Sequence, residues 1–191
     1  MKKHLLLYAA ASLLGATALL PSRASAQFTN GSNYIGPELG LGIGFGNGVM
    51  IGGMFETPIT NPGTVGPGRL AIAARIDYWS WSDNAYSDYS YTYSYIPIGV
   101  LCDYHFVLLD PKGIQSKWDP FIGIGLGYVI VSSSYSGPAI GDGFNPSSSY
   151  GSGLFFTGQV GVRYFFSPSM AIRAVYGLDY LPFCVGFDFK F

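Results

Sequence analysis

The sequence predicts an all-β fold, an antiparallel up-and-down transmembrane β-barrel of eight strands that follows a cleaved signal peptide. Two observations support this prediction. The chain is 49% hydrophobic and 17% aromatic, with only 11% charged residues and 27 glycines, which is typical of strands that face lipid and unlike a disordered chain. After residue 26, apolar side chains recur at every second position in segment after segment, which is the period of a β-strand.

The first 26 residues have the features of a secretory signal. Lys2 and Lys3 precede an apolar stretch over residues 5–20, and Ala24-Ser25-Ala26 supplies the small residues of a cleavage site. We expect cleavage between Ala26 and Gln27, so that residues 1–26 are a signal peptide, 27–33 a short N-terminal lead and 34–191 the barrel domain. An uncleaved anchor helix is the alternative, but the apolar stretch is short for a spanning helix.

Eight segments show the period of two, at about the 9–11 residues that a tilted strand needs to cross a bilayer. They are residues 35–45, 49–56, 70–79, 96–106, 121–130, 154–166, 170–180 and 183–191. The last is the clearest, because its phenylalanines and Val185 alternate with small or charged residues. No segment after the signal is apolar over the roughly 18 residues of a spanning helix. A chain of this kind can enter a membrane only as a closed barrel, which leaves no backbone group unpaired.

The connections divide into long and short ones. Residues 82–90 and 132–153 are rich in Ser, Tyr and Gly, and we expect them to be loops outside the cell. Ser167-Pro168-Ser169 is a tight turn on the periplasmic side, where turns are short. Residues 57–68 and 107–118 fall on that side too and are long for it, so the strand count follows less directly from the sequence than the barrel does.

Most charges within the strands fall on the predicted inner face. The inward set is Glu38, Glu56, Arg75, Asp77, Asp103, Arg163, Arg173, Asp179, Asp188 and Lys190. The interior of an eight-stranded barrel is just wide enough for side chains, and buried charges need partners. We expect ion pairs to close the lumen, with Arg163 and Arg173 at similar depth and Asp103, Asp179 and Asp188 as candidate partners. A selective pore or a proton path is the alternative.

The sequence offers little for catalysis or for a cofactor. His105 is the one histidine after the signal, and Asp103 lies on the same face, but the serines that a hydrolase would need cluster in the predicted loops. The glycines of residues 36–48 alternate along a strand, and no helix follows as a dinucleotide fingerprint requires. Cys102 and Cys184 form no zinc-binding spacing with this histidine, and we expect them on opposite faces without a disulfide. We therefore expect no catalytic residue, cofactor, metal or enzymatic activity.

Residues 78–95 interleave tyrosine and tryptophan with serine. An aromatic girdle at the outer bilayer interface is the favoured interpretation, with Trp118, Tyr164 and Phe166 in the inner girdle. A binding surface is the alternative, because tyrosine and serine together supply rigid contact area and adaptable hydrogen bonds.

Three stretches carry a resemblance to a known family. Residues 119–128 resemble the Pro-Tyr/Phe-x-Gly-x-Gly-x-Gly-Tyr strand of small outer-membrane barrels, residues 159–176 resemble the hairpin that follows it, and the chain ends in Phe191 after alternating aromatics. The sequence is similar to the eight-stranded OmpA/OmpX-type superfamily over nearly all of residues 34–191. The resemblance implies an outer-membrane location, contact with outer-membrane lipids, and recognition of Phe187, Phe189 and Phe191 by the barrel-assembly machinery. It does not imply one function.

Three roles remain open at this point. The first is a closed, monomeric barrel that is structural or that contacts an unknown extracellular ligand through its outer loops. The second is a narrow pore for ions or small apolar molecules, and the third is a lipid-modifying enzyme. We expect the first. The net charge of −1 gives no basic footprint for nucleic acid.

Overall fold

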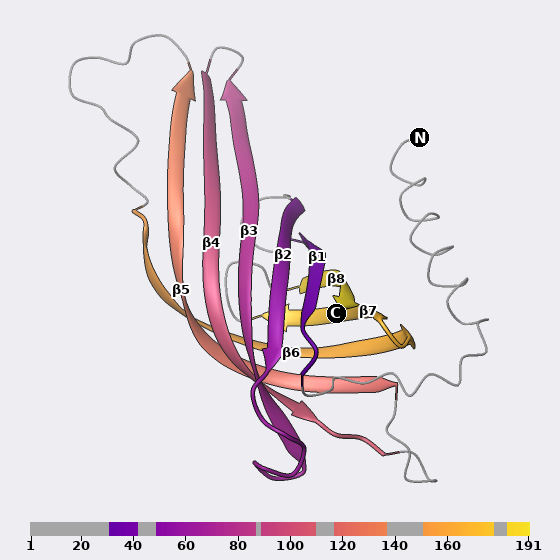
Figure 1. Ribbon diagram of the computed structural model, residues 1–191. Coiled ribbons are helices and arrows are strands. Elements are labelled where there is room, and N and C mark those ends of the chain that lie inside the picture. The colour runs from indigo at the N-terminus through magenta and orange to yellow at the C-terminus, as the bar shows by residue number, and fades with distance from the viewer. Residues whose placement is uncertain (1–30, 42–48, 87–88, 110–116, 137–150, 178–182) are drawn as a thin grey trace.

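The chain forms a closed barrel in the computed structural model, which describes residues 31–41, 49–86, 89–109, 117–136, 151–177 and 183–191. Its strands are β1 Tyr34–Leu41, β2 Val49–Pro58, β3 Gly68–Tyr86, β4 Tyr89–Phe106, β5 Trp118–Ser136, β6 Gly153–Ser167, β7 Met170–Gly177 and β8 Phe183–Lys190. Each strand pairs antiparallel with the next, and β8 pairs with β1 (Figure 1). The predicted eight-stranded up-and-down barrel is confirmed. The predicted signal peptide, with its cleavage site at Ala26 and Gln27, lies outside the described residues.

Side chains alternate between the two faces of the wall, as the period of two predicts. On β2, Ile51 points outward and is 62% exposed, whereas Met50 and Glu56 are fully buried inside. On β4, Cys102 is exposed on the outer face, whereas Cys184 of β8 is buried, and both thiols are free. The two cysteines therefore lie on opposite faces of the wall, as expected.

The outer face is an aliphatic band that needs lipid around it. On β5, Ile122, Ile124 and Leu126 are all at least half exposed, and Trp118 and Tyr128 stand on the same face at the two ends of this row. The distance from one aromatic to the other is about the 9–11 residues of a tilted membrane-crossing strand. The barrel therefore spans a membrane. Among the described residues, no helix is long and apolar enough to cross one.

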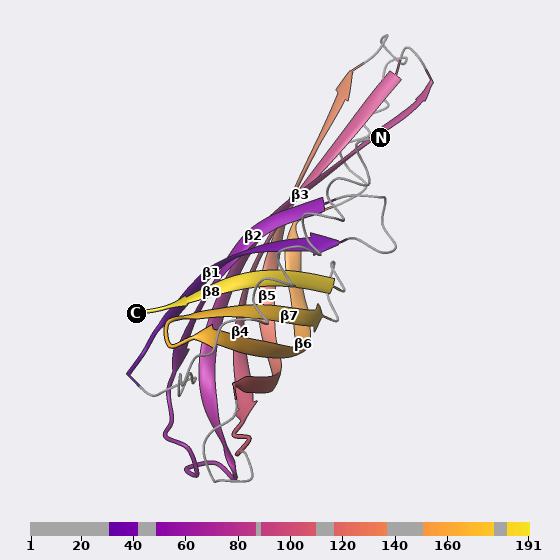
Figure 2. The ribbon, with the colours of Figure 1, turned by 90° about the vertical axis from the view of Figure 1, so that its right-hand side faces the viewer.

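The two ends of the barrel domain meet. The backbone nitrogen of Asn33 donates to the carbonyl of Phe191 at 2.8 Å, and that of Phe191 donates to the carbonyl of Asn33 at 2.9 Å. These two bonds continue the β1–β8 ladder to the last residue of the chain. The start of β1 and the end of β8 therefore share one end of the barrel, and the β3–β4 hairpin lies at the other (Figure 2).

Strands β3, β4 and β5 are longer than the other strands and extend into residues that the sequence predicts as loops. Residues 82–90 mostly belong to β3 and β4, and β5 continues to Ser136, inside the predicted loop 132–153. Pairing of β2 with β3 ends at Ile51 and Tyr78, and pairing of β5 with β6 ends at Val129 and Gly153. Beyond these points β3, β4 and β5 pair only with one another among the described residues, and they project above the barrel (Figures 1 and 2).

We call this projecting part, residues 79–86, 89–96 and 130–136, the extension. In residues 79–82 and 89–95, Trp or Tyr alternates with Ser or Thr, and aromatic residues favour strands. The Ser/Tyr composition predicts loops, but the pairing among β3, β4 and β5 continues into these residues.

Candidate functional site

The structure places most of the predicted inward charges inside the barrel. Fully buried are Glu38, Glu56, Arg75, Asp77, Asp103, Arg163, Arg173 and Asp188. Lys190 faces the same side of β8 but is only half buried near its end. Asp179 lies outside the described residues. Within the described ranges, the buried side chains include six carboxylates and four arginines.

Two of these buried charges are not in the inward set predicted from the sequence. Arg69 is 2% exposed and Asp119 is 7% exposed. Each lies at the start of a strand, just before the first residue of the predicted segment. Arg69 is two residues before the inward Ala71, and Asp119 is two residues before the inward Phe121. The alternation of inward and outward residues would therefore have predicted both charges if the predicted strands had begun earlier.

Arg163 on β6 is the centre of the buried charges. Its Nε donates to Asp188 Oδ2 at 2.5 Å, its Nη2 to Glu56 Oε2 at 2.5 Å, and its Nη1 to Asp119 Oδ2 at 3.3 Å. A guanidinium presents five N–H donors in a rigid plane, so one side chain serves carboxylates from β2, β5 and β8. The Arg163 side chain is completely buried.

A chain of ion pairs continues from there across the lumen. Arg173 lies directly opposite Arg163 in the ladder, and its Nε donates to the same Asp188, at 3.1 Å. Its Nη1 donates to Glu38 at 2.8 Å, and Glu38 in turn accepts from Arg75 at 2.8 Å. The carboxylates between the guanidiniums offset the repulsion of like charges.

The connected set, here called the lumen network, consists of Glu38, Glu56, Arg75, Asp77, His105, Asp119, Arg163, Arg173 and Asp188. Every one of the eight strands contributes at least one member. Asp103, an expected partner of the arginines, is not among them. Its place on β4 brings it to Gln159 instead.

His105 bridges two carboxylates within this network. Its Nε2 lies 2.6 Å from Glu56 Oε1, and its Nδ1 lies 2.9 Å from Asp119 Oδ1. Its ring stacks on Phe121 at 5.1 Å between centroids. Ionised carboxylates only accept hydrogen bonds, so both ring nitrogens donate and the ring carries a positive charge. Neither nitrogen is free to accept a proton from a serine.

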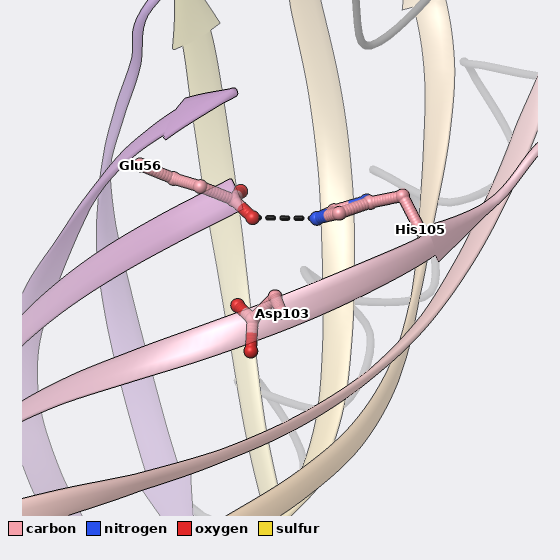
Figure 3. Close-up of side chains that lie close together, drawn as sticks. All are labelled: Glu56, Asp103 and His105. Atoms are coloured by element: carbon pink, nitrogen blue, oxygen red, sulfur yellow. Dashed lines mark hydrogen bonds and ion pairs between the residues drawn. The ribbon is translucent and has the colours of Figure 1, made fainter. Parts of the chain in front are cut away.

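Asp103 lies beside the Glu56–His105 pair (Figure 3), and it has a different partner. Gln159 Nε2 donates to both of its oxygens, at 2.9 and 2.8 Å. Within the described chain no cationic side chain forms an ion pair with Asp103, although it is completely buried. Ligand atoms of Glu56, Asp103 and His105 all lie within 4.8 Å of one another, a donor set that can hold a metal ion.

Two glycines make room for the inward acids. A Cβ on Gly123 would fall on Oδ1 of Asp103, and a Cβ on Gly52 would fall on Oδ1 of Asp77. Each glycine lies opposite its acid on the neighbouring strand. The glycine-rich inner face therefore lets carboxylates lie flat against the wall of a narrow barrel.

A second, apolar group fills the lumen toward the extension. Met50, Trp79, Phe121, Val175 and Cys184 form one buried cluster. Trp81 and Tyr95 of the extension pack against it while remaining partly exposed. Ion pairs thus occupy one level of the lumen, and apolar side chains occupy the next.

Above that cluster, the inner face of the extension is aromatic. Trp79 stacks on Tyr95 at 4.9 Å between ring centroids, Trp81 stacks on Tyr93 at 5.9 Å, and Tyr91 lies 4.8 Å from Tyr135. These are cross-strand neighbours in the β3–β4 and β4–β5 ladders. This series of rings, the aromatic face, continues the lumen side of the wall.

The opposite face of the extension carries hydroxyl groups. Ser82 Oγ lies 2.9 Å from Thr92 Oγ1, and Ser94 Oγ donates to Ser80 Oγ at 3.3 Å. This hydroxyl face continues the lipid side of the wall, so the outer surface changes from aliphatic to polar above Tyr78. The girdle interpretation of residues 78–95 is therefore wrong for most of their rings, because those on the aromatic face point away from lipid.

At the other end of the barrel the expected girdle residues are in place. Trp118 is 52% exposed and contacts Tyr164, with 4.7 Å between ring centroids. Phe166, on the same face of β6, packs edge-on against Phe187 of β8. Trp and Tyr side chains at this end of the barrel fit the position of a bilayer interface.

Solved structures with a similar fold are small membrane barrels. The N-terminal β-barrel domain of Pseudomonas aeruginosa OprF has 16% sequence identity and a TM-score of 0.50, and the match covers 86% of this chain and 100% of that one. The outer membrane protein OprG from the same organism has 13% identity and a TM-score of 0.49, covering 88% and 99%. A barrel from the de novo design of transmembrane β-barrels has 14% identity and a TM-score of 0.49, covering 86% and 99%.

Comparison of the sequence with models of protein families finds no match, and comparison with curated proteins finds none either. The likeness to OprF shows the fold, which is that of the small outer-membrane β-barrels.

Proposed function

We propose that this chain is an integral outer-membrane β-barrel with a closed lumen, and that it binds an extracellular ligand through the aromatic face of its extension. The observation that carries the proposal is the division of the extension into two faces. Rings gather on one side and hydroxyl groups on the other. Packing against the buried cluster accounts for the rings nearest the barrel, but the series continues beyond them to Tyr93, Tyr91 and Tyr135.

The composition of this face suits recognition. Tyrosine and tryptophan supply large, rigid, amphipathic contact area at low cost in side-chain entropy, and serine adds adaptable hydrogen bonds. The rings of Trp81 and Tyr93 are already stacked on each other and remain half exposed. A ligand can therefore meet them without first ordering them.

The closed lumen supports an interaction role over a transport role. Arg163, Arg173 and Glu56 fill the barrel with completely buried side chains, and the apolar cluster around Met50 and Trp79 fills the level above. A water-filled path would have to break both groups. We therefore expect no steady conductance from the purified protein in planar bilayers.

Adhesion of bacteria that carry the protein tests the binding role. We expect cells that produce the wild type to adhere to host-cell layers or to one another more strongly than cells that lack it. The double variant Trp81→Ala/Tyr93→Ala should abolish this gain, because it removes one stacked pair from the aromatic face.

The matched control is Ser82→Ala/Thr92→Ala, which removes a cross-strand pair from the hydroxyl face and should keep the gain. Heat-modifiable migration on gels confirms that each variant folds. No gain from the wild type, or an equal gain from the Trp81/Tyr93 variant, would contradict the proposed role.

A further inference from the structure

We propose that Glu56, Asp103 and His105 bind a divalent transition-metal ion inside the barrel, with zinc as the ion of choice for testing. Glu56 lies on β2 and the other two lie on β4, where positions 103 and 105 share the inner face. Strands β2 and β4 are not neighbours in the wall, so the three side chains meet across the lumen (Figure 3).

The donor set fits such an ion. Two carboxylates and one imidazole suit zinc and related metals, whereas calcium and magnesium prefer oxygen alone. The ligand atoms lie within 4.8 Å of one another. Ligands of one zinc ion stand roughly 3–3.5 Å apart, given bonds of about 2.0–2.2 Å. Small rotations of side chains therefore bring the set to coordination distance.

Glu56 and His105 are each already held in place through an atom that the metal would not use. Asp119 accepts from Nδ1 of His105, which leaves Nε2 toward the cluster. Arg163 donates to Oε2 of Glu56, which leaves Oε1. The Nε2 of Gln159 donates to both oxygens of Asp103 and so orients that carboxylate. Partners of this kind orient metal ligands and are a regular part of metal sites.

The buried charge of Asp103 gives an independent reason to expect a cation at this site. Asp103 is completely buried and has no ion-pair partner among the described residues, and an isolated buried charge is very costly. In addition, the amide oxygen of Gln159 is buried and accepts no hydrogen bond. A cation next to Asp103 would offset the charge of that carboxylate.

The balance of buried positive and negative charges in the lumen also supports a bound divalent cation. Within the described ranges, the six buried carboxylates exceed the four buried arginines by two. When the ion binds, Nε2 of His105 gives up its proton to solvent and coordinates the ion as neutral imidazole. The excess of two negative charges then equals the charge of one divalent ion.

Zinc binding to the detergent-extracted protein tests the proposal. The protein is stripped with a chelator and then receives zinc either before or after refolding, so that slow entry into the closed barrel does not hide the site. We expect one zinc ion per chain by elemental analysis and a higher thermal unfolding midpoint. Cobalt in place of zinc should give the visible absorption of a site with a nitrogen ligand.

Asp103→Asn should abolish the shift caused by zinc. Without metal, this variant should unfold at the same temperature as the wild type or higher, because it removes a buried charge that lacks a partner. Gln159→Leu should weaken zinc binding roughly 10–100-fold, the usual effect of losing a residue that orients a ligand. Asp77→Asn is the matched control, a buried lumenal acid outside the cluster, and should keep wild-type affinity.

Absence of zinc from both preparations of the wild type would overturn the proposal. Zinc held equally well by Asp103→Asn would overturn it too, because the ion would then be adventitious. His105→Gln repeats the test at a second ligand and should also lose the shift.

Discussion

Replacing Arg163 with methionine tests whether the lumen network holds the barrel together. Arg163→Met keeps most of the side-chain volume and removes the charge together with all donors. The wild-type side chain is completely buried and donates to Asp188, Glu56 and Asp119. The variant therefore isolates the electrostatic contribution from the cost of a cavity.

The structure sets the size of the effect. Three hydrogen bonds to charged groups at about 1.5–3 kcal/mol each would give an upper figure of roughly 4.5–9 kcal/mol. However, Asp188 keeps Arg173 as a partner, and Glu56 and Asp119 keep His105. Each carboxylate thus keeps one cation, which lowers the loss below the upper figure, but the excess of buried negative charge grows by one. We therefore expect a loss of about 3–5 kcal/mol, the usual cost of leaving a buried charge uncompensated.

Equilibrium unfolding in urea measures this loss. The barrel is refolded into detergent micelles or lipid vesicles, tryptophan fluorescence follows the transition, and linear extrapolation gives the free energy of unfolding. A loss of 3 kcal/mol corresponds to more than about 100-fold in the folding equilibrium.

Lys190→Met is the matched control, because it removes a half-buried cation from the end of β8. It should cost less than about 1 kcal/mol. Equal unfolding free energies for wild type and Arg163→Met, within about 0.5 kcal/mol, would refute the stabilising role of the network.

Three further predictions concern packing, closure and maturation. Gly123→Ala should cost about 1–3 kcal/mol in unfolding free energy, because its Cβ would collide with Asp103; Gly153→Ala, which meets no atom within 4 Å, should change it by less than about 0.5 kcal/mol. Deleting Phe191 should reduce the folded, heat-modifiable form in cells, because the backbone bonds that complete the β1–β8 ladder disappear; unchanged levels would count against this. Mass spectrometry of the outer-membrane fraction should find Gln27 as the first residue, and an intact signal in that fraction would contradict the predicted cleavage.

Which face of the wall a residue occupies could be predicted from the sequence. Alternation on β2 assigned Met50 and Glu56 to the interior and Ile51 to the exterior, and all three lie there. The reason is physical: the side-chain period of a strand is two, and only one face of a barrel wall can be apolar all along a membrane.

The ends of strands and the partners across the lumen could not be predicted in the same way. Residues 82–90 resemble a loop by composition and keep no period of two, yet most of them belong to β3 and β4. Contacts such as Glu56 with His105 depend on how far each strand is staggered around the barrel. Alternation places a side chain inside but says nothing about its height along the barrel axis. The sequence therefore predicts arginine partners for Asp103, whereas the structure brings it to Gln159.

The extension is built from the same backbone ladder as the barrel wall, and this continuity has a consequence for any binding event. Fixing a flexible backbone costs about 1–2 kcal/mol of conformational entropy for each residue. In the extension that entropy is already lost when β3, β4 and β5 pair with one another. A partner that settles on the stacked rings of Trp81 and Tyr93 therefore meets a preorganised surface, and the energy of its contacts goes into affinity instead of into ordering a loop.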